Sequence, residues 1–316
     1  MPDFTDEKCE GICVRIVLFP GQGSLRPGMG LPWRSHSART LLSDISDISG
    51  VDVARLVDEA DKEELVRTDN AQLATFALSA MAGAACGDLN ADLAIGHSLG
   101  EYSALAFAGI LDLASATRLV LERGRAMAEA SSLTPGTMVA VLGAEPDVLL
   151  RAIASFPGLV VANRNAPGQC VVAGPLESIN AFREQSKELG IRKVMALDVG
   201  GAFHSPLMAP AQPALITILS ATQFHDGSIP VVANIDATPH QDASPWPMLL
   251  AEQLTGPVLF QESIETIETI TESDLEFIEL GPGGVLCGLV KRMKPDATLL
   301  SIGTPEDVVS NKKELS

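Results

Sequence analysis

The chain has 316 residues, which is enough for a large hydrophobic core in one or two domains. Hydrophobic residues make up 46% of the chain and charged residues 20%, and this composition excludes an intrinsically disordered protein. The 40 Asp and Glu outnumber the 22 Lys and Arg, so the net charge is −18. A chain with this overall field does not attract nucleic acid, and we expect no nucleic-acid partner.

Three further features predict a cytoplasmic protein. The five cysteines are scattered along the chain, and their spacing fits neither a zinc site nor a disulfide framework. The first ten residues are acidic, where a secretory signal would be basic. The longest weakly polar stretch, residues 71–86, is too short to cross a bilayer and predicts a buried helix. We therefore expect no membrane partner and no metal site.

The first predicted core element is a buried strand over Val14–Phe19, after a loose tail at residues 1–13. The strand ends in a turn-rich loop, residues 20–24, in which Gln22 stands between two glycines. Such a loop could present backbone N–H groups to a ligand, and it could equally be an ordinary turn into a helix. Amphipathic helices are predicted over residues 43–82, with breaks near 49–50 and 68–70.

The next segment has the pattern of a nucleophile elbow. An apolar run over residues 92–95 enters the turn Gly96-His97-Ser98-Leu99-Gly100, and a helix-forming run follows it. In such a turn the serine hydroxyl is exposed above the amino end of the helix, where the dipole favours negative charge. The backbone N–H of Leu99 can then donate to an oxyanion. This pattern predicts that Ser98 is a catalytic nucleophile.

A helix is predicted over residues 113–130, followed by a composition shift at residues 131–136 that we interpret as a domain boundary. Residues 137–199 then follow the order β-α-β-β-α-β, which is typical of a ferredoxin-like unit inserted into a larger domain. Beyond residue 200 we expect a strand at 230–234, helices at 249–254 and 258–270, a strand at 275–280 and a helix at 285–293. Residues from 304 onward are charged and are expected to be a frayed tail.

A serine needs a base within hydrogen-bond reach, and the chain has five histidines. His204 follows a strand end and two glycines, as a functional loop residue would, and is the best candidate. His97 lies inside the elbow, where its side chain should point away from Ser98, so we assign it a supporting role. No acid between Ser98 and His204 lies on a convincing loop. The sequence therefore predicts a dyad in which a neutral group, such as a backbone carbonyl, orients the imidazole.

Six segments resemble the malonyl-CoA:acyl carrier protein transacylases and the related acyltransferase domains of polyketide synthases. They occur in the family's order and span most of residues 14–300. The segments are FPGQGS (19–24), GHSLGEYSAL (96–105), ERGRAM (122–127), AFHSPLM (202–208), QLTGPV (253–258) and ELGPGGVL (279–286).

The resemblance implies that Ser98 becomes acylated, that His204 is its base, and that the N–H groups of Gln22 and Leu99 form the oxyanion hole. It also implies that Arg123 binds the malonyl carboxylate through two parallel hydrogen bonds, which lysine could not reproduce.

Two further roles come from the same resemblance. The main chain of Gln253 would help to orient the histidine. The bulky Phe203 is typical of malonyl specificity, although rejecting one extra methyl group is worth only about 1–3 kcal/mol.

For the whole chain, the resemblance implies an α/β-hydrolase-like core at residues 14–136 and 200–303, with a ferredoxin-like subdomain at 137–199. The expected reaction is ping-pong transfer from malonyl-CoA to an acyl carrier protein, by a monomer without a cofactor. Two alternatives stay open: a serine hydrolase acting on acyl thioesters, and a non-catalytic module that binds carrier proteins. The sequence does not distinguish fatty acid synthesis, polyketide synthesis and malonate decarboxylation as the pathway.

Overall fold

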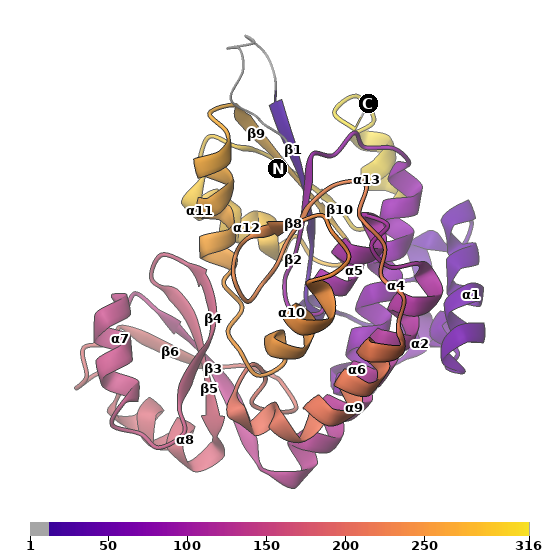
Figure 1. The fold of residues 1–316 in the computed structure, drawn as a ribbon. Helices are drawn as coiled ribbons and strands as arrows, with labels where there is room; N and C mark the ends of the chain where they lie inside the picture. Colours follow the sequence, from indigo (N-terminus) through magenta and orange to yellow (C-terminus); the bar gives the residue numbers. More distant parts are fainter. Residues whose placement is uncertain (1–12, 316) are drawn as a thin grey trace.

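The computed structural model describes residues 13–315, which form a mixed α/β fold with two sheets (Figure 1). The larger sheet has six strands in the spatial order β10-β9-β1-β2-β7-β8. The neighbouring strands in its first five positions are parallel, and β8 pairs with β7 in the antiparallel sense. Its strands are β1 (Cys13–Phe19), β2 (Leu93–Gly96), β7 (Val231–Val232), β8 (Pro239–His240), β9 (Asp274–Leu280) and β10 (Thr298–Ile302).

Helices cover both faces of this sheet, so its central strands are hydrophobic on both sides. Ile16 and Leu18 of β1 belong to the apolar cluster formed with α11 and α12. Val17 and Phe19, which point the other way, belong to the cluster formed with α4, α5 and α6. These helices are α4 (Thr68–Cys86), α5 (Gly100–Phe107), α6 (Leu113–Leu133), α11 (Phe260–Ile270) and α12 (Val285–Met293).

The smaller sheet is antiparallel, with the spatial order β4-β5-β3-β6. In chain order its elements are β3 (Gly136–Leu142), α7 (Pro146–Ile153), β4 (Val160–Ala166), β5 (Gln169–Pro175), α8 (Leu176–Gln185) and β6 (Lys193–Ala196). The sheet and its two helices enclose a separate apolar cluster, and they stand to one side of the larger sheet in Figure 1.

Two backbone hydrogen bonds join β4 to the segment before α11. The N–H of Val258 donates to the carbonyl of Ala162, and the N–H of Arg164 donates to the carbonyl of Val258, each over 2.9 Å. The smaller sheet is therefore fastened to the larger unit at this point as well as through the covalent chain.

The remaining helices complete the layers around the sheets. They are α1 (Thr40–Ser49), α2 (Val53–Glu59), α3 (Lys62–Val66), α9 (Gln212–Ala221), α10 (Trp246–Gln253) and α13 (Pro305–Ser310), with short 3-10 turns at Gln22–Ser24, Leu31–Trp33, Ser37–Arg39 and Pro206–Ala211. Within residues 13–315, no helix is long and apolar enough to span a bilayer.

We expected a frayed tail from residue 304 onward, and this prediction is wrong for residues 305–310. Thr304 caps α13 there, because its hydroxyl accepts the N–H of Asp307 while the Asp307 carboxylate accepts the N–H of Thr304. The preceding strand β10 was not predicted, and the strand expected at 230–234 is reduced to Val231–Val232. The tail predicted at 1–13 lies outside the described residues, except for Cys13, which begins β1.

Candidate active site

Ser98 lies in a tight turn between β2 and α5, with a φ of +55° that costs a non-glycine residue roughly 1–2 kcal/mol. The turn requires glycine on both sides of Ser98. A Cβ on Gly96 would lie 2.0 Å from the nitrogen of Glu101, and a Cβ on Gly100 would lie 2.0 Å from the carbonyl oxygen of Phe19. The sequence therefore forms a nucleophile elbow, in which the Ser98 hydroxyl projects from the edge of the sheet where β2 ends.

The structure brings His204 to this hydroxyl across 106 residues of sequence, with Ser98 Oγ and His204 Nε2 2.6 Å apart. The other ring nitrogen, Nδ1, lies 2.9 Å from the backbone oxygen of Gln253. A carbonyl can only accept, so Nδ1 carries the proton and Nε2 is free to accept the proton of Ser98. Burial, with the Arg123 guanidinium as a second cause, lowers the pKa of His204 to about 3. The imidazole is therefore neutral at pH 7.

Arg123 of α6 is 1% exposed and reaches the same hydroxyl, with its Nη2 donating to Ser98 Oγ over 3.1 Å. Its other hydrogen bonds go to neutral side-chain amides, from Nη1 to Gln72 over 2.7 Å and from Nη2 to Gln253 over 2.9 Å. Its Nε is buried and has no hydrogen-bond partner within residues 13–315. Burial lowers the pKa of the guanidinium, but arginine stays charged at neutral pH. The site thus holds a positive charge with a spare donor beside the nucleophile.

The buried carboxyl group of Glu101 supports this arrangement, and sequence reasoning did not single it out. Its Oε1 accepts the backbone N–H of Asn234, and its Oε2 accepts from Gln253 Nε2, each over 2.6 Å. The Gln253 amide also donates to the carbonyl of Ser98 over 2.9 Å. Burial raises the pKa of Glu101 to about 8. An acid in the first turn of a helix usually complements its dipole, so its position alone gave no sign of this role.

Asn234 is a second residue that sequence reasoning missed. Its Oδ1 accepts the N–H of Ser98 over 2.7 Å, and its Nδ2 donates to the carbonyl of Gly96 over 2.6 Å. A signal for it did exist. Asn234 follows β7, and the carboxyl ends of parallel neighbours β2 and β7 meet at the same edge of the sheet.

His97 points away from Ser98, as expected for a supporting residue. Its Nε2 lies 2.9 Å from Oδ1 of Asn165, and its ring lies against Phe260, with centroids 5.7 Å apart. Burial lowers its pKa. Because Asn165 belongs to β4, this contact ties the elbow to the smaller sheet.

The remaining predicted site residues lie close to these groups. The loop carrying Gln22 lies against the elbow. The N–H of His97 donates to the carbonyl of Phe19, just before this loop, over 2.9 Å. A Cβ on Gly21 would lie 3.1 Å from the carbonyl oxygen of His97. Leu99 precedes the first residue of α5, and Phe203 is buried next to His204. Among residues 13–315, no group of three or more His, Cys, Asp or Glu side chains could hold a metal ion.

Comparison with known proteins places this geometry in a family of acyltransferases. The model of the acyl transferase domain family matches residues 16–300. The chain is 37% identical over 299 residues to the malonyl CoA-acyl carrier protein transacylase of Bacillus subtilis (strain 168), covering 92% of this chain and 94% of that protein. This chain belongs to the acyl transferase domain family.

Solved structures agree with that assignment. A malonyl transacylase (MCAT) from Streptococcus pneumoniae superposes with a TM-score of 0.87 at 33% identity, covering 95% of this chain and 99% of the other. The transacylase PlMCAT, solved with the type II polyketide synthase acyl carrier protein AntF, superposes with a TM-score of 0.89 at 31% identity, with the same coverage of 95% and 99%.

Proposed function

We propose that this chain transfers a malonyl group from malonyl-CoA to the phosphopantetheine thiol of an acyl carrier protein. The observation that carries the proposal is the Arg123 cation next to the Ser98 hydroxyl, whose hydrogen bonds go only to neutral groups. Within residues 13–315 no carboxylate hydrogen-bonds to this buried cation, and the free carboxylate of a malonyl group would do so. The names of the relatives point to the same substrate pair.

In the first half of the reaction, Ser98 donates its proton to Nε2 of His204 as its Oγ attacks the thioester carbon. The oxyanion that forms would accept hydrogen bonds from the backbone N–H of Gln22, in the loop after β1, and from that of Leu99, in the elbow. The C–S bond then breaks, and the coenzyme A sulfur takes the proton from His204. The malonyl group is left as an ester on Ser98, with its carboxylate on Arg123.

The second half repeats these steps with a different nucleophile. His204 accepts the proton of the carrier protein's thiol, the sulfur attacks the ester carbon, and the C–O bond to Ser98 breaks. The proton returns from His204 to Ser98 Oγ. Gln253 supports both halves, because its carbonyl fixes the tautomer of His204 and its side-chain amide contacts Arg123. The buried ring of Phe203 would crowd a branched acyl group.

We also propose which fold each of the two parts of the chain adopts. The parallel sheet with helices on both faces and a nucleophile elbow supports an α/β-hydrolase-like core at 14–136 and 200–303. The strand order β4-β5-β3-β6 and the chain order β-α-β-β-α-β support a ferredoxin-like subdomain at 137–199. We further propose that the protein is a cytoplasmic monomer and that it uses no cofactor.

The test is mass spectrometry of the protein after addition of malonyl-CoA alone, followed by addition of the acyl carrier protein with its phosphopantetheine arm attached. The proposal expects a lasting malonyl adduct on the peptide containing Ser98 and its disappearance when the carrier is added, with malonyl appearing on the carrier thiol. The Ser98→Ala variant should form no adduct. Absence of an adduct on the wild-type protein would overturn the proposal.

The same experiment decides between transfer and hydrolysis. A thioester hydrolase would release free malonate steadily without any carrier protein, and no adduct would accumulate. A non-catalytic binding module would leave malonyl-CoA intact, and the Ser98→Ala substitution would then change nothing. The 2.6 Å contact between Ser98 and a neutral imidazole favours a catalytic serine over that last reading.

A further inference from the structure

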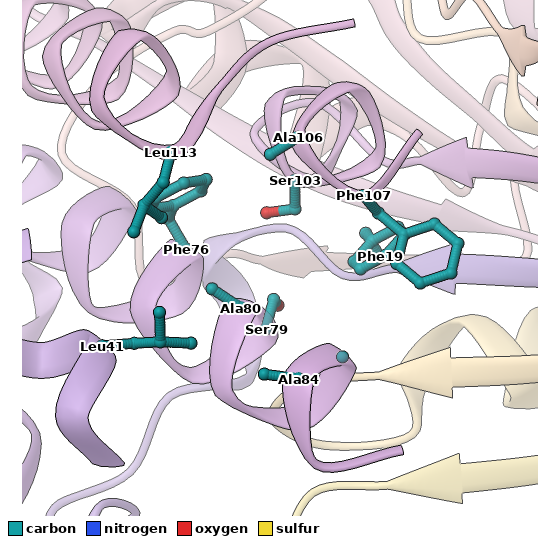
Figure 2. A pocket seen from close by; sticks show the side chains of 11 residues that line it. Phe19, Leu41, Phe76, Ser79, Ala80, Ala84, Ser103, Ala106, Phe107 and Leu113 are labelled. Atoms are coloured by element: carbon teal, nitrogen blue, oxygen red, sulfur yellow. The ribbon is translucent and has the colours of Figure 1, made fainter. Parts of the chain in front are cut away.

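A pocket lies between helices α4 and α5 (Figure 2). Its volume is about 200 Å³, and it is bounded by Phe19 of β1, Phe76 of α4, Phe107 of α5, and the side chains of Leu41 and Leu113. Figure 2 shows Phe76 and Leu113 on one side of this space and Phe19 and Phe107 on the other. Neither Ser98, His204 nor Arg123 lines it, so it is distinct from the acyltransfer site.

Two polar groups interrupt the apolar lining. Ser79 of α4 is 0% exposed and Ser103 of α5 is 4% exposed, and neither hydroxyl has a hydrogen-bond partner within residues 13–315. The hydroxyls of helical Ser and Thr can donate to the carbonyl four residues back, as those of Ser131 and Thr117 do in this chain. The hydroxyls of Ser79 and Ser103 do not, and both side chains line the pocket, where Figure 2 shows the Ser103 oxygen pointing into the space beside α4.

An unpaired buried hydroxyl is unfavourable, so these two groups call for a partner inside the pocket. The lining contains no charged side chain, which favours a neutral partner. A dry cavity of about 150 Å³ lined by Leu, Ile and Phe accommodates a benzene ring, so this larger pocket has room for a ring with a small substituent. Ala84 at its edge is exposed, which gives a path from solvent.

We propose that this pocket is a binding site for a small, neutral, mostly apolar molecule that carries one hydroxyl or carbonyl group, such as an aromatic alcohol. The apolar body would contact the three phenylalanine rings, and the polar group would exchange hydrogen bonds with Ser79 and Ser103. The occupant would contact the helix that begins just after the nucleophile and the strand that leads into the Gln22 loop. Nothing in this proposal depends on the acyl substrate.

The test is a titration with benzyl alcohol, followed by NMR of the protein labelled at its alanine and leucine methyl groups. The proposal expects saturable shifts at Ala80, Ala106 and Leu113, with a dissociation constant on the order of 1 mM, as befits so small a ligand. Shifts confined to Leu99 and Ala202, beside the catalytic residues, would overturn it. Shifts that grow without saturation, or no shifts at all, would also overturn it, since water alone would then fill the space.

Two variants locate the binding. Ala80→Leu fills the pocket and should weaken benzyl alcohol binding by at least about tenfold, while the matched Ala154→Leu change, on an exposed position next to α7, should leave it unchanged. The Ser79→Ala/Ser103→Ala double variant should weaken benzyl alcohol by about tenfold and leave toluene binding unchanged, because only the alcohol loses its hydrogen bonds. Equal losses for both probes, or none for benzyl alcohol, would show that the hydroxyls do not recognise a ligand.

Discussion

The backbone carbonyl of Gln253 accepts a hydrogen bond from Nδ1 of His204, at 2.9 Å. In many serine enzymes a carboxylate occupies this position. A carbonyl fixes the same tautomer without adding a negative charge, and its hydrogen bond raises the pKa of the ring by less than burial lowers it. Burial then dominates, and the pKa of His204 falls to about 3.

The first prediction follows from that low pKa. The base form of His204 is present above its pKa, so the rate of Ser98 acylation should stay nearly constant as the pH falls from about 8 to about 5. Single-turnover acylation by malonyl-CoA, monitored by mass spectrometry across this range, measures it. A rate that halves near the ordinary histidine pKa of about 6.5 would contradict the prediction.

The same shift predicts how stability depends on pH. The unfolded chain protonates His204 near its ordinary pKa, whereas the folded protein keeps the ring neutral down to about 3. The stability that the neutral ring contributes is therefore present above pH 6.5, approximately, and is lost as the pH falls below it. Urea unfolding of wild type and His204→Gln at several pH values between about 4 and 7 should show a steeper loss for the wild type.

A second prediction concerns Arg123. The Arg123→Lys variant keeps the charge but loses the planar set of donors, so malonyl loading should fall by about 10- to 100-fold. Loading of an acetyl group, which has no carboxylate, should fall much less. The comparison uses malonyl-CoA and acetyl-CoA at equal concentrations, and equal losses for both would remove Arg123 from carboxylate recognition.

A third prediction tests Glu101 as a positioning residue. The Glu101→Gln variant keeps the size of the side chain but replaces one accepting oxygen with a donor, so it cannot accept from both Asn234 and Gln253. We expect kcat to fall by about 10- to 100-fold with little change in KM, because the hydrogen bonds that align Ser98 and Gln253 are disturbed. Glu101→Asp, which keeps both oxygens on a shorter stem, should retain more activity. A loss of kcat as large in Glu101→Asp as in Glu101→Gln would contradict the positioning role.

The ionisation of Glu101 should also change how the free energy of unfolding depends on pH. Its folded pKa, about 8, lies above the ordinary value of 4.5, so its contribution to stability is full at low pH and is lost as the pH rises through about 8. The Glu101→Gln variant lacks this titration. The difference in free energy of unfolding between wild type and variant should therefore shrink from pH 5 to pH 9, approximately, and a constant difference would contradict the raised pKa.

A fourth prediction concerns His97. Removing its ring in His97→Ala leaves Asn165 without its partner and should cost about 1–3 kcal/mol of stability. Because the ring points away from Ser98, the pH profile of acylation should be unchanged. Thermal unfolding and the single-turnover profile measure the two effects, and a shifted profile would assign His97 a part in the chemistry.

The sequence was most informative where local chemistry decides the structure. The elbow at Ser98, the core strand at 14–19 and the helix at 285–293 follow from glycines, apolar runs and turn residues close in sequence. The choice of His204 followed from its flanking glycines, and the role of Arg123 followed only from the family resemblance. A helical arginine is ordinarily solvent-exposed, and the packing of α4, α5 and α10 around α6 buries this one.

The residues that sequence reasoning missed act across long separations. Asn234 and Glu101 are 133 positions apart, and each has an unremarkable local pattern. Their partnership depends on which strands become neighbours, and strand order is a property of the tertiary fold. Strand β10 and helix α13 were missed for a similar reason, since an edge strand and a short capped helix carry little periodicity of their own.

The fastening of β4 to the larger unit has a mechanical consequence. Two bonds at Val258 and the contact between His97 and Asn165 attach the same strand at neighbouring points, and one of those points adjoins Ser98. A movement of the smaller sheet would therefore also displace the turn that orients the Ser98 hydroxyl. A change that displaces the smaller sheet should therefore lower the catalytic rate as well, even if it leaves every catalytic side chain in place.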